Sequence, residues 1–271
     1  MSTQNMVGRP LRTIIADTVG SAQNVIVVNP ARETIRELVT TLDELDAPPA
    51  VDVLANERAL KDEMDDFLIG SLAADLIDAD ILTIRVLDDP PVNSLLVTSE
   101  AVVSVVEAGS TAAGLGTAEE SFVEATRAFY DERWDEADPF TLRTPPLTAV
   151  RSTLEDELGA ETVADFDAVL DSLSVARGDG DGLDEVTISL LVAARNEQLL
   201  YDISKWGEDV GLASKATFSR TKTQLEDRGL LDTEKVPIDV GRPRLRLLLG
   251  TDALREADAS ELAEQAMAQL R

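Results

Sequence analysis

Residues 186–249 read VTISLLVAARNEQLLYDISKWGEDVGLASKATFSRTKTQLEDRGLLDTEKVPIDVGRPRLRLLL, and this stretch decides the fold of the C-terminal part of the chain. Apolar residues recur at helical spacing in two segments, which predicts two helices before residue 211. The predicted helices are Val186–Arg195, with Val186, Ile188, Leu190, Leu191 and Ala194 on its apolar side, and Tyr201–Val210, with Ile203, Trp206 and Val210.

A tight turn and a third helix follow. Gly211-Leu212-Ala213 can form the turn, because glycine adopts a positive φ without steric cost. Ser214 stands at the N-cap of a predicted helix Lys215–Arg228, since its hydroxyl can accept a hydrogen bond from the first helical turn. Gly229 stands where a C-terminal capping glycine is expected. The stretch therefore predicts a helix-turn-helix.

Two β segments, Leu230–Val236 and Leu245–Leu249, flank a loop that contains Gly241 and Pro243. Arginines gather around this loop, at Arg242, Arg244 and Arg246. A helix-turn-helix followed by a basic hairpin is the arrangement with which a winged helix-turn-helix places one helix in the major groove and its wing on the DNA backbone. We therefore expect double-stranded promoter DNA as the partner.

The third helix carries the residue types that DNA contacts require. Hydroxyls can bind phosphates or base edges, and cations bind phosphates or guanine. The candidates here are Ser214, Lys215, Thr217, Ser219, Arg220, Thr221 and Lys222. Helical spacing predicts that Thr217, Arg220 and Thr221 share one exposed surface and that Lys222 contacts phosphate. Phe218, Leu225 and Leu230 are expected in the core.

The charge distribution supports this interpretation. Between Arg195 and Arg246 stand ten Lys/Arg and nine Asp/Glu residues, a net charge of +1, whereas the whole chain carries −28 and the remainder therefore −29. Four of the five lysines lie between Lys205 and Lys235. Such a charge run has two alternative interpretations. It can be a solvated helical face, or it can belong to a winged helix that binds only proteins.

Composition narrows the function classes. The chain has no Cys and no His, which excludes disulfides, thiolate catalysis, Ser–His triads and most transition-metal sites. Its 52 Asp/Glu residues, few lysines and small apolar residues are typical of haloarchaeal proteins. In molar salt the Debye length is about 3 Å, so the self-repulsion of such a chain is screened. We expect a cytoplasmic protein without a signal peptide, a membrane span or a cofactor.

Strands and helices alternate in the N-terminal part, which predicts an α/β domain with a mixed sheet. The predicted helices are Leu11–Val19, Ala31–Leu45, a helix from Asn56, Asp65–Ala79 and Thr117–Glu136, the last with a capping box of Thr117 and Glu120. The predicted strands are Asn24–Val28, Val51–Leu54, Ile81–Leu87, and a hairpin of Ser94–Thr98 and Ala101–Glu107. Residues 109–116 are expected to be a flexible loop.

Ligands of open α/β sheets bind beyond the carboxyl ends of the strands. Polar residues at predicted strand ends, and a Gly/Ser/Thr segment that could cradle an anion, are candidate contacts for a small metabolite such as a sugar phosphate. They are Asn29, Asn56, Thr98, Ser99, Gly109, Ser110 and Thr111, with Asp88 nearby. Ordinary turn and cap roles are the alternative, because neither a GxGxxG fingerprint nor a P-loop is present.

The expected domains are residues 1–138, an α/β dimerisation or effector-sensing domain; 139–183, a linker with connecting helices; and 184–271, the winged helix-turn-helix with a C-terminal helix. Within the second segment, Leu147–Leu158 and Ala160–Leu173 are predicted helices that either form the first layer of the winged helix or connect the domains. Residues 179–184 fail the calcium-loop pattern and are expected to be a flexible acidic loop. A last predicted helix, Ala253–Leu270, packs either on its own domain or on a partner subunit.

The segments NVIVVNP (24–30) and GLASKATFSRTKTQLEDRGLLDTEKVPIDVGRPRLRLLLG (211–250), with the acidic composition, resemble the haloarchaeal winged-helix transcriptional regulators of the TbsP family, and distantly the TrmB-type sugar-responsive regulators. The resemblance covers most of the chain. It implies a DNA-binding regulator of central carbon metabolism genes. TrmB-type proteins usually place the helix-turn-helix first, whereas here it comes second, so their effectors are not carried over.

Three functions remain open from the sequence. The first is a homodimeric transcription factor without enzymatic activity, whose N-terminal domain dimerises or senses a metabolite. The second is an α/β enzyme acting on a phosphate ester, with an accessory winged helix; the missing His, Cys and phosphate loop leave it few catalytic groups. The third is an interaction scaffold, against which the basic wing argues.

Overall fold

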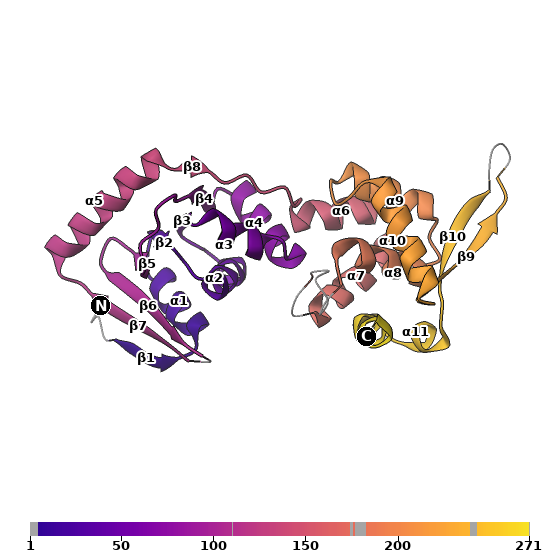
Figure 1. The fold of residues 1–271 in the computed structure, drawn as a ribbon, viewed down its shortest axis with the longest axis horizontal. Coiled ribbons are helices and arrows are strands. Elements are labelled where there is room, and N and C mark those ends of the chain that lie inside the picture. Colours follow the sequence, from indigo (N-terminus) through magenta and orange to yellow (C-terminus); the bar gives the residue numbers. More distant parts are fainter. Residues whose placement is uncertain (1–4, 110, 174–175, 177–182, 239–242, 271) are drawn as a thin grey trace. The chain divides into compact units, whose positions relative to one another are not determined.

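The computed structural model describes residues 5–109, 111–173, 176, 183–238 and 243–270. The chain divides into two compact units (Figure 1). The first consists of Met1–Asp65 with Leu72–Leu142, and the second of Asp66–Ser71 with Arg143–Arg271.

The first unit is built on an eight-stranded mixed sheet with the order β1-β7-β6-β5-β2-β3-β4-β8. Strands β2, β3 and β4 run parallel, and the remaining pairs are antiparallel. The strands are β1 Met6–Arg9, β2 Asn24–Val28, β3 Ala50–Ala55, β4 Leu82–Val86, β5 Ser94–Val97, β6 Val102–Ala108, β7 Thr111–Thr117 and β8 Asp138–Pro139. The predicted α/β domain with a mixed sheet is confirmed.

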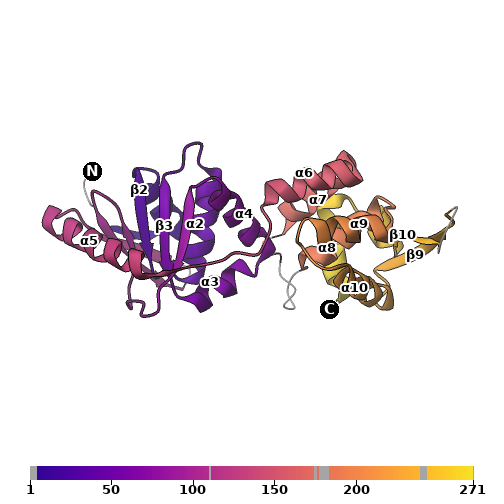
Figure 2. The ribbon, with the colours of Figure 1, turned by 90° about the horizontal axis from the view of Figure 1, so that it is seen from above.

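Helices cover both faces of this sheet to different extents (Figures 1 and 2). They are α1 Leu11–Val19, α2 Arg32–Glu44, α3 Glu57–Met64, α4 Phe67–Asp78 and α5 Glu120–Glu136. Helices α1 to α3 lie on one face, and α5 crosses the other. Along β2 the side chains alternate between the faces, so that Ile26 and Val28 pack under α5.

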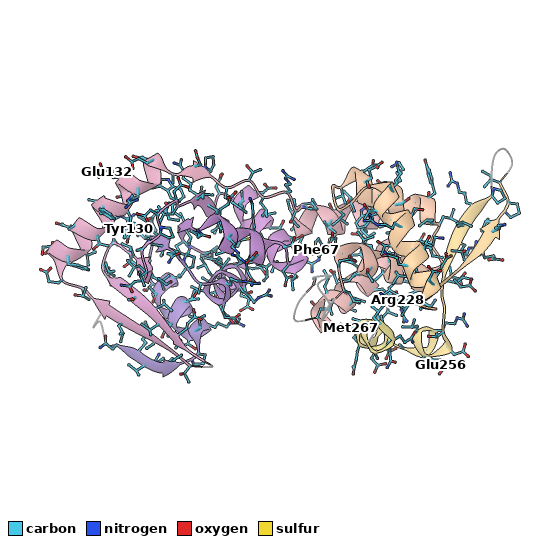
Figure 3. All side chains as sticks on the ribbon, in the orientation of Figure 1. Phe67, Tyr130, Glu132, Arg228, Glu256 and Met267 are labelled. Carbon is cyan, nitrogen blue, oxygen red and sulfur yellow. The ribbon has the colours of Figure 1, made fainter. Side chains whose placement is uncertain are left out.

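Helix α5 covers only part of its face. Its buried side chains, Val123 and Tyr130, join a core cluster with residues of β2, β3, β5 and the start of β6, at Val102. Tyr130 is labelled in Figure 3, on the same helix as the outward-pointing Glu132. In the described part of the chain, no helix packs on this face over β7, β1 and the rest of β6.

The expectation of a flexible loop at 109–116 is wrong, because residues 111–117 form β7 between β1 and β6. The small residues that suggested flexibility are required by packing. A Cβ on Gly114 would lie 2.9 Å from Ile14 Cγ2 of α1, so only glycine permits the helix to approach this strand. Strand β1, which pairs with β7, has no counterpart among the predicted elements.

The predicted capping box of the long helix is also wrong. Thr117 is the last residue of β7 and pairs with Val102, so it stands too early to cap α5. Glu119 is the N-cap instead, and its carboxylate accepts a hydrogen bond from the Phe122 N–H at 2.9 Å. The hydrogen bond from the Ser121 hydroxyl, followed by that backbone bond, lowers the pKa of Glu119.

The second unit is helical, with one two-stranded hairpin. Its elements are α6 Leu147–Leu158, α7 Ala160–Ser172, α8 Glu185–Arg195, α9 Leu200–Asp209, α10 Lys215–Asp227, β9 Leu231–Val236, β10 Arg244–Leu249, α11 Asp252–Glu256 and α12 Ala259–Leu270. Helices α6 and α7 pack on each other, and they also contact α9 and α8 respectively. These two helices therefore belong to the same compact body as the helix-turn-helix.

The last predicted helix is interrupted. Thr251 caps α11, and the extended backbone of Ala257 separates α11 from α12. Helix α12 buries Leu262, Ala263 and Ala266 and lies against α7 and α8. Its apolar side is thus covered by its own unit.

The chain segment at the start of α4 also belongs to the second unit. The rings of Phe67 and Phe166 meet edge to face with centroids 6.4 Å apart (Phe67 is labelled in Figure 3). The buried Asp66 carboxylate accepts hydrogen bonds from the N–H groups of Leu68 and Ala176. These contacts fix the segment to α7.

Candidate nucleic-acid interface

The helix-turn-helix is held together by aromatic packing behind α9 and α10. Trp206 of α9 is fully buried, and its indole Nε1 donates a hydrogen bond to Thr153 Oγ1 at 3.0 Å. The neighbouring Gly207 lies against the ring of Phe218 on α10. A Cβ on Gly207 would lie 2.3 Å from two ring carbons, so glycine sets the distance between the two helices.

The turn and both caps of α10 form as predicted. Gly211 has φ +89°, a conformation that suits glycine. The Ser214 hydroxyl accepts a hydrogen bond from the Thr217 N–H at 3.2 Å, which confirms Ser214 as the N-cap. At the other end, Gly229 has φ +73° and the Leu230 N–H donates to the Leu225 carbonyl, the bond of a Schellman cap.

Helix α10 has one buried side and one exposed side. Phe218, Thr221 and Leu225 point inward, at spacings of three and four residues. The predicted exposed surface of Thr217, Arg220 and Thr221 is therefore wrong for Thr221, which is only 8% exposed. Thr217 is half-buried, with its hydroxyl 3.1 Å from that of Ser214. Because Phe218 and Leu225 face the core, Thr221 between them must face it too.

The exposed residues of α10 are mostly polar and include two cations. They are Lys215, Ala216, Ser219, Arg220, Thr223, Gln224 and Asp227. Arg220 and Ser219 were candidate DNA contacts from the sequence. Thr223 and Gln224 were missed, although their distance from Phe218 along the helix already places them opposite the core.

Several cations of the helix-turn-helix are already paired with carboxylates. Lys215 Nζ lies 2.7 Å from Glu208 Oε2, and their hydrogen bond lowers the pKa of Glu208 and raises that of Lys215. Lys205 Nζ lies 2.6 Å from Asp209 Oδ2. These ion pairs neutralise positive charge next to the exposed side of α10.

Lys222 does not lie on the exposed surface where a phosphate contact was predicted. Its side chain is only 12% exposed, and its Nζ binds Glu226 Oε2 at 2.7 Å. The side chain lies along the flank of the helix that faces the unit, one position beyond the buried Thr221. Lys222 as a phosphate contact stays a prediction, and it would require the side chain to leave Glu226.

The hairpin β9–β10 is present as predicted, and its described arginines are held by neighbours. The Arg244 guanidinium stacks 4.4 Å from the Tyr201 ring centroid and bonds Asp202 at 3.3 Å. Arg246 lies 3.9 Å from Glu197 and 3.7 Å from Glu234. Arg242 lies outside the described residues.

Backbone contacts fix the hairpin to the helices. Leu199 forms a β-bridge with Arg246, and the Leu247 N–H donates to the Gln198 carbonyl at 2.9 Å. The loop between α8 and α9 thus extends the two-stranded sheet at one edge. This attachment fixes the base of the wing relative to α9.

Arg220 differs from these paired cations. Among the described residues of α9, α10 and the hairpin, only Arg220 and Lys235 carry a positive charge without an ion pair in the structure. Arg228, at the C-cap of α10 and labelled in Figure 3, is likewise exposed and without one. Arg220 is thus the free guanidinium on the outward face of α10.

The candidate effector residues of the first unit do not converge on one site. Asn29 and Asn56 follow β2 and β3 and lie at the carboxyl edge of the parallel strands. Thr98 and Ser99 lie at the opposite edge, because β5 runs antiparallel to β2 and ends next to Ile26. The expectation that the polar strand ends form one pocket is therefore wrong for Thr98 and Ser99.

Most of these residues have local structural roles. Asn29, with φ +45°, donates its amide to the Pro91 carbonyl, and Asn56 caps α3. Thr98 closes the β5–β6 turn through bonds with Ala101. Gly109, with φ +64°, lies in the β6–β7 connection, where the Thr111 hydroxyl donates to the Ala108 carbonyl; Ser110 lies outside the described residues. An effector site stays a prediction.

The second unit contains a polar pocket of about 490 Å³ that no sequence pattern predicted. Its two arginines are already engaged. Arg195 pairs with Asp165 at 3.2 Å and donates to the Ala257 carbonyl, and Arg255 donates to the Leu249 carbonyl. The pocket residues thus join α7, α8, β10 and α11.

Two kinds of feature are absent from the described residues. No group of three or more Asp or Glu side chains is placed to hold a metal ion. No described helix combines the length and apolar character that a bilayer crossing requires.

Comparison with known proteins identifies the family. Residues 3–145 match the N-terminal domain of TbsP-like transcriptional regulators, and residues 146–267 match their C-terminal helix-turn-helix domain. No curated protein matches the chain. Among solved structures, TrmBL2, an archaeal chromatin protein whose structure "shows a novel mode of DNA binding", is 15% identical, with a TM-score of 0.37 over 51% of this chain. This chain spans about half (55%) of the length of that protein. The two matching domains together cover nearly the whole sequence, and the chain therefore belongs to the family of TbsP-like transcriptional regulators.

Proposed function

We propose that this regulator binds promoter DNA by placing the outward face of α10 in the major groove. The observation that carries the proposal is the single free guanidinium, Arg220, at the middle of an exposed polar helix face. An α-helix fits the major groove, where an arginine can bond guanine O6 and N7 together.

Neighbouring residues on the same face supply further base contacts. Gln224, one turn after Arg220, has the amide geometry that recognises adenine N6 and N7. Ser219 and Thr223 carry hydroxyls that donate to or accept from base edges. This set has no acidic residue before Asp227, so the first three turns can approach DNA without repulsion.

Backbone contacts surround this face. Ser214, Lys215 and Thr217 lie at the N-terminus of α10, where the helix dipole favours a phosphate, although the Lys215 N–H now donates to Glu208 and the Thr217 N–H to Ser214. Arg242, Arg244 and Arg246 supply phosphate contacts from the wing. Lys215, Arg244 and Arg246 must exchange their carboxylate partners for phosphates when DNA binds.

The cellular setting of the proposal rests on composition and resemblance. The acidic, lysine-poor chain is suited to a haloarchaeal cytoplasm of molar salt, and the TbsP-like family resemblance favours genes of central carbon metabolism as targets. We propose a homodimer, because two recognition helices about 34 Å apart read an inverted-repeat operator. A second contact offsets the weak electrostatic attraction of one unit in such salt.

The test is electrophoretic mobility shift with a promoter fragment in high KCl, using two matched arginine variants. Arg220→Ala should cost about 1–3 kcal/mol on the specific site and much less on random duplex. Arg228→Ala removes the same charge from the end of the same helix and should weaken both duplexes alike. If Arg220→Ala lowered affinity for both duplexes by one factor, α10 would contact only the backbone and the readout proposal would be wrong.

A further inference from the structure

The half of the first unit's sheet that α5 leaves open carries an unusual surface. The strand register shows which side chains of β6 and β7 point to the same face as Val102. Val102 pairs with Thr117, and Val106 pairs with Ala113. Val7 of β1 also pairs with Ala113. Val102 itself is covered by α5; we call the remaining set the open face, and it consists of Val7, Ser104, Val106, Ala108, Thr111, Ala113, Leu115 and Thr117.

None of these eight residues is charged, in a chain of which 28% of residues are charged. Val106, Ala113 and Val7 form a continuous row across three strands, with Leu115 diagonal to it. Ordinary solvated faces of antiparallel sheets alternate apolar residues inside with polar residues outside. The outer positions here are apolar or small instead.

Helix α5 extends this surface. Phe122 and Phe129 are seven residues apart and so lie on one side of the helix. At 100° per residue, Arg127 lies roughly 150° round the helix from the two phenylalanines, and its guanidinium bonds Asn24 of β2. The phenylalanines therefore lie on the other side of α5, toward β5 and β6. Val7, Val106, Leu115, Phe122 and Phe129 are between 44% and 70% exposed, and together account for most of the exposed large apolar side chains of the unit.

We propose that the open face and the Phe122–Phe129 side of α5 are where a second copy of this chain docks, and this rests on the dimer of the proposed function. Charge favours this occupant. In molar salt the net charge of −28 is screened beyond about 3 Å, so repulsion acts mainly between acidic residues in direct contact. A twofold axis brings the same surface of both copies together, so the uncharged open face meets an uncharged open face, and the charge next to Phe129 on α5 is the guanidinium of Arg133, 5.3 Å from the ring.

The area approaches that of a stable pair. The seven-residue β6 and β7, the four-residue β1 and one helix side by side give a flat footprint of roughly 500 Å² before side-chain relief is added. Stable interfaces bury about 800 Å² of accessible surface per partner, the same order. The alternative dimer surface from the sequence, the last helix, already packs on its own unit through Leu262 and Ala266.

Light scattering on the full chain in molar KCl tests the proposal. The unmodified chain should show twice the 29.2 kDa of one chain. Leu115→Glu and, separately, Phe129→Glu should raise the dissociation constant by about a hundredfold or more, because each buries an unpaired carboxylate in both copies. Both residues are half-exposed, so circular dichroism and the unfolding temperature of the separated chains should stay close to those of the parent.

Val92→Glu is the matched control, since Val92 is 99% exposed, apolar and in the connection between β4 and β5. It adds the same charge and should leave the dimer intact. A monomeric parent chain with and without DNA, dimers in both Glu variants, or dissociation by Val92→Glu as well would each overturn the proposal. Arg220→Ala separates the two proposals. It should keep the mass of a dimer while losing affinity for the specific DNA site. Leu115→Glu should instead lose the dimer and keep weak binding to random duplex.

Discussion

Two exposed surfaces of this protein depart from its acidic character in opposite ways. The outward side of α10 carries hydroxyls, an amide and one free guanidinium, whereas the open face of the sheet carries no charge at all. The first suits a polyanion, and the second suits an identical acidic chain. In a protein of this net charge, the sites of association are recognised by where acidic residues are missing.

Replacing a glycine by alanine should have the largest effect on stability and binding. It tests whether the outward side of α10 and the open face depend on separate parts of the fold. In Gly207→Ala the new methyl would meet the Phe218 ring at 2.3 Å, so α9 and α10 must separate. We expect the second unit to lose about 2–3 kcal/mol of unfolding free energy despite the better helix propensity of alanine, and DNA binding to be lost. Differential scanning calorimetry and gel shift measure these effects.

Gly114→Ala is the counterpart in the first unit. Its methyl would meet the flexible ends of Ile14 and Met6 at 2.9 and 3.0 Å, which can move more easily than an aromatic ring. The loss should be about 1 kcal/mol and confined to the first unit's transition. If Gly207→Ala weakened the dimer as much as it weakened DNA binding, the two surfaces would not be separate.

Gln224→Ala sharpens the assignment of α10 with an intermediate effect. It should cost about 1–3 kcal/mol on the specific site, and relax the preference for one base pair in a binding-site selection experiment. Gln265→Ala, the same change on α12, should leave affinity and selectivity unaltered. An unchanged base preference in Gln224→Ala would restrict readout to Arg220 and its hydroxyl neighbours.

Glu208→Gln should have the smallest effect, and in the opposite direction. It removes the carboxylate that binds Lys215 Nζ, so the freed ammonium can contact phosphate. We expect affinity for any duplex to rise about two- to fivefold, and the salt slope to grow by about one unit. Glu264→Gln on α12 removes the same charge from an exposed position and controls for long-range repulsion; an equal gain there would mean that the Lys215 pair has no specific role.

Local signals in the sequence identified the helix-turn-helix well. Ser214, Gly211 and Gly229 act through their own backbone geometry, which depends on few distant contacts, and each was predicted correctly. The exposed side of α10 was harder to predict. Periodicity from Phe218 identifies the buried side, but the candidates were chosen by side-chain chemistry, so the buried Thr221 was included and Gln224 was left out.

Prediction was weaker where tertiary packing overrides composition. Residues 111–117 look like a flexible segment because they are small, yet α1 requires small residues on the strand beneath it. The rule that ligands bind beyond the carboxyl ends of strands grouped Thr98 with Asn29. Because β5 runs antiparallel to β2, these two residues lie at opposite edges of the sheet. Neither the antiparallel insertion of β5 next to β2 nor the pairing of β1 with β7 is encoded in any local pattern.

The carboxylates that hold Lys205, Lys215, Arg244 and Arg246 have a consequence for how this regulator searches a genome. A genome offers on the order of a million or more competing sites, and a cation bound to its own glutamate gains little by moving to an arbitrary phosphate. In the proposed binding mode the exchange weakens binding to every duplex, and only the operator adds base contacts that offset it. The internal ion pairs would therefore shorten the time spent on random DNA while leaving the ratio of specific to random affinity unchanged.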